Sequence, residues 1–444
     1  MSFPNLKILI MELSRRCTIP NYNKSSKVLL ILILLLSVRT SNSINFYKKN
    51  DSINNIVKPF FYSFIIQDSP VGLTTMRQSD ENYINMYRFL SNELNKNVNL
   101  KTGFLIQTFA ELLLYPITHE EGHRSILTSC GIGSISQPLY NLQGFAFVNG
   151  VRDNELENLR DNDLPDYIRL HTAGIESDYM LGNKAEEDII FNFDSKRNLF
   201  VEVYFRKLAT IAYYTGSLVP SLSPNLNENS NELLNDIVGH DVYGAIKNLH
   251  RPNIPFYRYT DYKDLTKEEL KYLKRVGYRA LLNIGSPVFF KTLNIIKNKN
   301  LKLSLSTGYN MCPFGDFIDE KVYIQFNNNY NFRAYFRQFE NNNTWFMGGG
   351  LSLVDYKISS KLNTTIDSHF WTQPKKLDFK TTQSQFGGSG DILFKYIILE
   401  NKSHNSLSLD LGLNYKTEGF LPEEVILKEN VGVRLGVTVN LIQK

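Results

Sequence analysis

Residues 431–441 read VGVRLGVTVNL, with an apolar side chain at every second position. Successive side chains of a β-strand point to opposite faces of a sheet, so this period of two predicts a strand with one apolar and one polar face. The odd-numbered positions from Val431 to Leu441 are all Val or Leu. The even-numbered positions hold Gly432, Arg434, Gly436, Thr438 and Asn440. The stretch therefore indicates an antiparallel β domain at the C-terminal end of the chain.

The same alternation recurs throughout residues 300–444, for example in LKLSLSTGY (301–309) and SLSLDLGLNY (406–415). Two architectures explain it: a soluble sheet with one solvated face, or a membrane barrel with an apolar outside. The strands are long and the segment has room for about eight of them, which is the size of a small outer-membrane barrel. This part resembles bacterial outer-membrane β-barrels, and we expect a small barrel that contacts the membrane.

Residues 44–299 have a helical pattern, so the predicted fold class is α+β. Apolar residues recur at spacings of three and four in ENYINMYRFLSNELNK (81–96) and LPDYIRLHTAGIESDYMLG (164–182). Ahead of this domain, Lys24 and Lys27 precede an apolar run from Val28 to Val38, and small residues follow up to Ser43. We interpret residues 1–43 as a secretory signal peptide, which predicts export to an outer membrane, the periplasm or the cell surface.

Charge and cysteine content narrow the function classes. The net charge of +5 comes from 49 basic and 44 acidic residues that are scattered along 444 positions. Because no basic run or patch is visible, we expect no nucleic-acid partner. After removal of the signal peptide, Cys130 and Cys312 remain, and the sequence leaves open whether they pair.

The stretch PITHEEGHRSI (116–126) contains two histidines four residues apart. On a helix, His119 and His123 would lie on the same face, so both imidazoles could converge on one ion. Glu120 would be rotated by about 100° from His119, beside such an ion. The helix either begins at Thr118 or runs through Pro116. A polar helical turn without metal is the alternative interpretation.

HEEGH resembles the HExxH motif of the zincin metallopeptidases, and its setting is similar to the gluzincin subgroup. The resemblance implies a Zn2+ cofactor, with His119 and His123 as metal ligands and Glu120 as general base acting on a metal-activated water. It also implies a third ligand on a later helix, where a glutamate completes gluzincin sites. We expect Glu176 in that role.

Glu176 is favoured because Ala173 and Gly174 would let its helix approach the HEEGH helix closely. His171 and Asp178 compete with it from the same segment. Asp241, in GHDVYGAIKNLHRP (239–252), is a further alternative as a ligand or as a carboxylate that orients a ligand. A helix N-cap explains Asp241 equally well and is the interpretation that we rank first.

The leading functional hypothesis is a zinc-dependent hydrolase, a metallopeptidase acting on a peptide or protein substrate. The alternative is a non-enzymatic outer-membrane or surface protein whose helical domain binds a partner. In the first case hydrolysis depends on Glu120, whereas in the second it does not.

Overall fold

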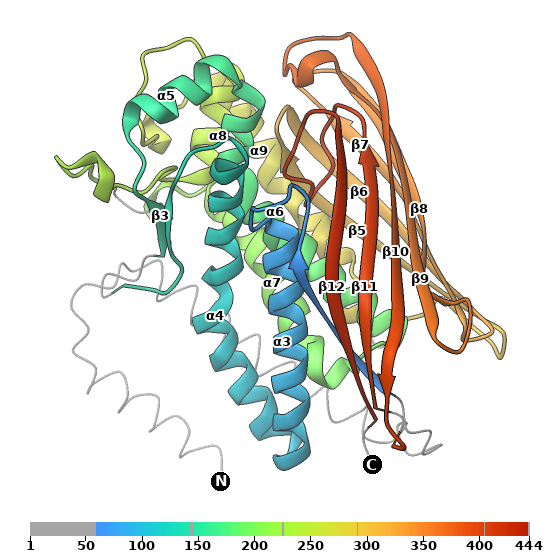
Figure 1. Ribbon diagram of the computed structural model, residues 1–444. Coiled ribbons are helices and arrows are strands. Elements are labelled where there is room, and N and C mark those ends of the chain that lie inside the picture. Colours follow the sequence, from blue (N-terminus) through green and yellow to red (C-terminus); the bar gives the residue numbers. More distant parts are fainter. Residues whose placement is uncertain (1–58, 142–145, 224–225, 291, 404, 443–444) are drawn as a thin grey trace, which may run out of the picture. The chain divides into compact units, whose positions relative to one another are not determined.

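The computed structural model describes residues 59–141, 146–223, 226–290, 292–403 and 405–442. Apart from Asn141, the described residues belong to one compact unit. The predicted signal peptide, residues 1–43, lies outside the described part. The α+β fold class is confirmed: helices pack on one face of a large antiparallel sheet (Figure 1).

The helical part supplies most of the chain up to residue 285. Its helices are α3 (Met76–Asn97), α4 (Leu100–Ser129), α5 (Asp153–Asn162), α6 (Leu164–Ile190), α7 (Lys196–Gly216), α8 (Asp241–His250) and α9 (Lys267–Arg279). A two-stranded sheet of β2 (Ile135–Gln137) and β3 (Phe147–Asn149) follows α4. In the described part of the chain, no helix has the length and hydropathy needed to cross a membrane.

The large sheet has ten strands, and each neighbouring pair is antiparallel. Its order is β1 (Pro59–Gln67), β12 (Asn430–Ile442), β11 (Ser406–Lys416), β10 (Ser384–Glu400), β9 (Leu362–Pro374), β8 (Trp345–Lys357), β7 (Tyr330–Glu340), β6 (Gly315–Phe326), β5 (Leu301–Cys312) and β4 (Ile296–Lys297). The prediction of about eight strands in a closed barrel is not confirmed, because the described strands form an open sheet between the edge strands β1 and β4.

The unpredicted strand β1 comes from the segment that precedes the helices. Helix α3 covers its free edge with polar side chains. The Asn85 Oδ1 accepts a hydrogen bond from the Ser63 backbone N–H at 3.1 Å, and the Asn82 Oδ1 accepts one from the Ile65 N–H at 2.8 Å. These bonds satisfy edge groups that a closed barrel would satisfy with another strand, so the sheet has no need to close at this side.

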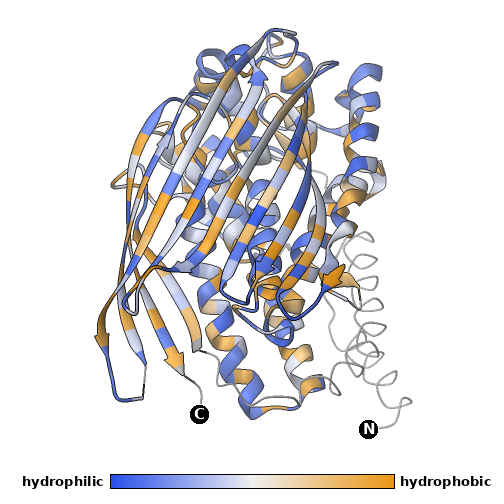
Figure 2. Ribbon diagram, turned by 90° about the vertical axis from the view of Figure 1, so that its right-hand side faces the viewer, coloured by the Kyte–Doolittle hydropathy of each residue, from blue (hydrophilic) through white to orange (hydrophobic). Residues whose placement is uncertain are grey.

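The sheet has its polar face inside, against the helices. On β11, Asp410 and Asn414 are buried, whereas Leu409, Leu411 and Leu413 are exposed. Figure 2 shows the resulting alternation of hydrophobic and hydrophilic residues along the strands. Ion pairs and hydrogen bonds join the polar face to α6. The Tyr179 hydroxyl, for example, donates to Asp319 on β6 at 2.6 Å.

Helix α4 continues through Pro116, so the HEEGH motif lies in its second half rather than in its first turn. Cys130 and Cys312, whose pairing could not be decided from the sequence, are both free thiols.

Candidate metal centre

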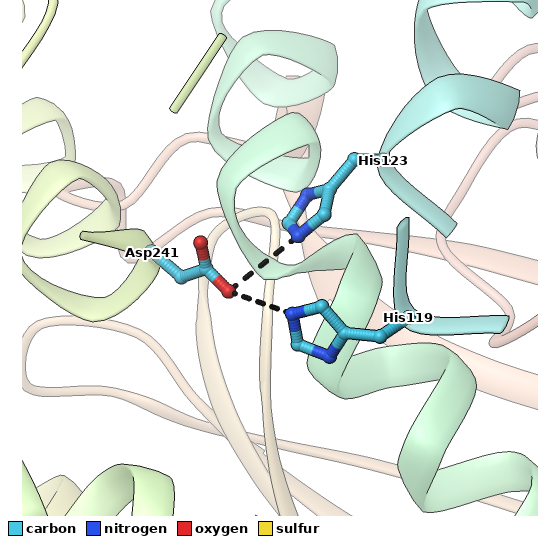
Figure 3. A group of neighbouring side chains, drawn as sticks. All are labelled: His119, His123 and Asp241. Carbon is cyan, nitrogen blue, oxygen red and sulfur yellow. Dashed lines mark ion pairs between the residues drawn. The ribbon is translucent and has the colours of Figure 1, made fainter. Parts of the chain in front are cut away.

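His119 and His123 lie one turn apart on α4, and Asp241 approaches them from the first turn of α8 (Figure 3). The Asp241 Oδ2 is 3.4 Å from the His119 Nε2 and 3.5 Å from the His123 Nε2. One donor atom from each residue lies within 4.8 Å of the others, and all three side chains are buried.

This spacing suits a metal ion. Two ligand atoms that each bind a tetrahedral metal at about 2.0–2.1 Å are roughly 3.3 Å apart. The Asp241 Oδ2 is buried and has no hydrogen-bond partner among the described residues. The two imidazole nitrogens lie at ion-pair distance from it, and a buried carboxylate oxygen without a hydrogen bond costs free energy unless something binds it. Two imidazole nitrogens and a carboxylate oxygen are common metal ligands in proteins, so the three residues could hold a metal ion.

A partner at the Nδ1 atom fixes the orientation of each imidazole ring. The His119 Nδ1 lies 2.8 Å from the Asp178 Oδ2, and the other carboxylate oxygen of Asp178 accepts a bond from Arg206 at 2.7 Å. The His123 Nδ1 lies 2.6 Å from the Leu170 carbonyl oxygen, which can only accept. Each Nδ1 therefore carries the hydrogen in the neutral ring, and each Nε2 presents its lone pair toward Asp241.

Glycines let α4 and α6 approach closely enough for this arrangement. A Cβ atom on Gly174 would lie 2.5 Å from the Nε2 atoms of both His119 and His123. A Cβ atom on Gly122 would lie 2.5 Å from the Ala173 carbonyl oxygen. A larger residue at position 122 would require movement of the helices, and one at position 174 would displace the imidazole rings or α6, so the sequence HEEGH has a packing reason for its glycine.

Opposite charges dominate the electrostatics of the centre. Burial alone would lower the pKa of both histidines, but Asp178 and Asp241 hold the pKa of His119 well above its usual value, and Asp241 raises that of His123. Burial would raise the pKa of Asp241, yet His123 and His119 hold it far below the usual range. These shifts favour protonated imidazole rings beside an ionised Asp241.

Two further carboxyl groups lie in the electrostatic environment of the histidines. Burial raises the pKa of Glu120 to about 7, although His119 and His123 oppose the shift. Burial likewise raises the pKa of Asp236 to about 6, against the effect of His123. A carboxyl group with a pKa near neutrality can both accept and release a proton at physiological pH.

Glu176, the expected third ligand, lies elsewhere. Its two oxygens bind Arg169 at 2.6 and 3.1 Å, and one of them also accepts the Glu423 backbone N–H at 2.9 Å. The carboxylate that lies beside His119 and His123 is that of Asp241. Asp241 is the first residue of α8 and directly follows the N-cap His240, so a helix does begin at this point, as the N-cap interpretation expected, although Asp241 itself is not the cap.

Of the two remaining alternatives for the third ligand, one contacts the centre and the other does not. Asp178 orients His119 but is not a member of the His119, His123 and Asp241 group. His171 is buried beside Gly244 on α8, where burial lowers its pKa to about 3, and both ring nitrogens lack a hydrogen-bond partner in the described structure. Arg206 binds Asp178, and its charge within an otherwise apolar helical segment is the one sequence feature that could have pointed to it.

No protein-family model matches the chain, and a search of curated proteins finds no significant match. Any chemical assignment for this centre consequently rests on the geometry of His119, His123 and Asp241 and on their neighbours.

Proposed function

We propose that the protein is a zinc-dependent metallopeptidase in which His119, His123 and Asp241 hold the zinc ion and Glu120 is the general base. One observation carries the proposal: two imidazoles, each anchored through Nδ1, turn Nε2 toward a buried carboxylate oxygen that has no hydrogen-bond partner among the described residues. In known zinc sites, carboxylate or carbonyl groups behind the histidines have this orienting role.

Zinc, Glu120 and Asp178 have different roles in the proposed reaction. Zinc, when bound, supplies a Lewis acid that polarises a substrate carbonyl and makes water more acidic. Glu120 follows His119 directly on the helix and is rotated by about 100° from it, so its carboxylate lies beside the ligands. It takes the proton from the attacking water and returns it to the leaving amine. Asp178 keeps His119 in place during this exchange.

We propose further that the chain is exported and attached to an outer membrane through its sheet, which would act as a barrel-like wall. The exposed leucines of β11 and the polar interior of the sheet support this location, because membrane barrels have an apolar outside and a polar inside. The substrate would then be a peptide or protein in the periplasm or at the cell surface.

The test compares Glu120→Gln with Glu121→Gln in the full chain. Glu121 is the adjacent acid, half-buried and paired with Arg124 at 2.6 Å, and it is the matched control. Metal analysis and mass spectrometry of a peptide library are the two readouts. Both variants should keep the zinc content of the wild type, but only Glu120→Gln should lose hydrolysis. A wild-type chain that takes up no zinc would contradict the proposal.

The second candidate is a non-enzymatic surface protein with a structural metal site. The burial of the centre favours it, since His119, His123 and Asp241 are at most 7% exposed and structural zinc sites are closed. In that case the wild type binds zinc, cleaves no member of the library, and does not differ from Glu120→Gln.

A further inference from the structure

The first half of α4 has the reverse of the polarity that is usual for a helix of a water-soluble protein. Phe109 is 64% exposed, whereas Glu111, two residues further on, is completely buried. The other exposed apolar residues of this half are Leu105, Ile106 and Leu113. An amphipathic helix on a soluble protein turns its apolar stripe to the core and its polar face to water. Here the polar side faces inward.

The buried side of the same turns faces charged partners. Glu111 accepts a hydrogen bond from the Tyr83 hydroxyl at 3.2 Å and lies 3.5 Å from the guanidinium of Arg206. Between α3, α6 and the inner face of the sheet there is a cavity of about 280 Å³ whose lining includes Arg88 and Asp367. Ionisable groups that face the interior and pair with one another are typical of proteins surrounded by lipid.

Helix α3 has the same reversed polarity. It exposes Met86 and Leu90, while Arg88 between them is buried and paired with Asp194 at 3.0 Å. On its other side, Asn82 and Asn85 satisfy backbone groups of β1, as described above. In a bilayer every such group must be satisfied within the protein, and the bonds from α3 achieve this at the edge where the sheet would otherwise be open.

Helix α3 ends and α4 begins at one end of the molecule (Figure 1). The Asn92 side chain donates to the Tyr62 hydroxyl, and Tyr62 lies near the β12 terminus of the sheet. Turns that include residues 298–300, 358–361 and 401–403 lie at this same end of the strands. The exposed lysines there are Lys96, Lys101, Lys297, Lys299, Lys357, Lys361 and Lys402. Glu93 and Glu400 are acidic residues of the same end, so positive charge predominates.

We propose that the outer faces of α3 and the first half of α4 contact the acyl chains of a phospholipid bilayer, and that the lysines at this end contact anionic headgroups. Leu105 and Leu113 are eight positions apart, or about 12 Å along the helix, which fits within one leaflet of a hydrocarbon core about 30 Å thick. Clustered lysines beside an apolar surface suit anionic lipids.

Lipid fits these surfaces better than a protein partner does. The reversed polarity is found on α3, on α4 and on the outer face of the sheet, and a protein would have to cover both the helical side and the sheet side. A bilayer covers all of them at once. The helices and the sheet would then share one lipid-facing perimeter around a polar interior.

Tryptophan fluorescence in vesicles with brominated acyl chains tests the contact. The chain has two tryptophans, Trp345 and Trp371, which are first replaced by phenylalanine. Phe109→Trp is then compared with Leu234→Trp, since Leu234 is also an exposed apolar residue but adjoins β3 through the Gly150 to Leu233 hydrogen bond. In phosphatidylcholine and phosphatidylglycerol vesicles, bromine should quench Phe109→Trp several-fold more than Leu234→Trp. Equal quenching would overturn the proposal.

A second comparison of variants tests whether the lysines contribute to binding of anionic lipid. The double variant Lys96→Glu with Lys101→Glu should bind phosphatidylglycerol vesicles several-fold more weakly than the wild type, whereas Lys271→Glu, at an exposed lysine of α9, should not. Dimers in sedimentation that shield Phe109→Trp from bromine would overturn the lipid proposal in favour of a second copy of the chain. Glu120→Gln should bind vesicles like the wild type, so failure of the hydrolysis proposal leaves this one standing.

Discussion

Asp178 lies behind His119, with its Oδ2 2.8 Å from the ring Nδ1, on a helix that contributes no ligand atom to the His119, His123 and Asp241 group. The second oxygen of Asp178 is held by Arg206, and the Tyr115 hydroxyl donates to Oδ2 as well. The carboxylate is therefore fixed before any ion binds. Its negative charge also increases the basicity of the imidazole.

Asp178→Asn should weaken metal binding by about 10- to 100-fold, the usual effect of losing a group that orients a ligand. Zinc titration against a competing chelator measures it. Asp188→Asn is the matched control, because Asp188 is a buried acid on the same helix that lies 3.3 Å from Arg88. Equal affinities for the two variants would show that the bond to His119 has no role in metal binding.

Asp241→Asn should lower the metal content, whereas Glu176→Gln should lower the stability and leave the metal content unchanged. Asp241→Asn removes the negative charge of the proposed ligand, so the purified chain should bind less metal than the wild type. Glu176→Gln should keep the metal but lower the free energy of unfolding by about 3 kcal/mol, because Arg169 is left buried without a charged partner. Elemental analysis and urea unfolding separate the two. Loss of metal from Glu176→Gln alone would reinstate Glu176 as the ligand.

The sequence could predict half of the candidate centre. The spacing of His119 and His123 fixes their common face on any helix. Ala173 and Gly174 correctly indicated which helix approaches α4. They did not indicate which carboxylate would turn toward the histidines, because that depends on the rotation of α6 about its axis. Glu176 faces Arg169, and the carboxylate that lies beside the two histidines belongs to Asp241 of α8, whose position depends on tertiary packing.

The fold was predictable to a similar degree. Alternation identified the long strands after residue 300, since a period of two needs no tertiary information. It could not identify β1, because FFYSFII (60–66) lacks a clear alternation. It also could not tell which face of the strands lies inside. That depends on the polar surface of α6, whose Tyr179 donates a hydrogen bond to Asp319 on β6.

Gly174→Ala should disrupt the centre more than its size suggests. The added methyl group would meet the Nε2 atoms of both histidines, so either the rings or α6 must move. We expect weaker metal binding and a loss of about 1–3 kcal/mol in stability from overpacking. Gly216→Ala, near the end of α7, adds a methyl group that meets no atom within 4 Å and should change neither property. Normal metal affinity in Gly174→Ala would contradict the close packing of the helices.

The last prediction concerns the pH dependence of the contact between α6 and the sheet. Glu186 is completely buried, lies 3.1 Å from Lys207, and accepts a hydrogen bond from the Tyr323 hydroxyl on β6. Burial would raise its pKa, but Lys207 and Lys321 lower it from 4.5 to about 2. A carboxylate with a depressed pKa stabilises the fold above its unfolded pKa, and this contribution is lost as the pH falls toward the folded one.

Glu186→Gln should therefore lower the free energy of unfolding by about 3 kcal/mol at pH 7, and the difference from the wild type should shrink below a pH of about 4.5. Urea unfolding between pH 7 and pH 3 gives the profile. Glu320→Gln on β6 is the control, since Glu320 is exposed and should leave the profile unchanged. A difference between Glu186→Gln and the wild type that stays constant down to pH 3 would show that Glu186 ionises as an ordinary carboxyl group. In that case Lys207 and Lys321 would not stabilise the contact between α6 and the sheet through the negative charge of Glu186.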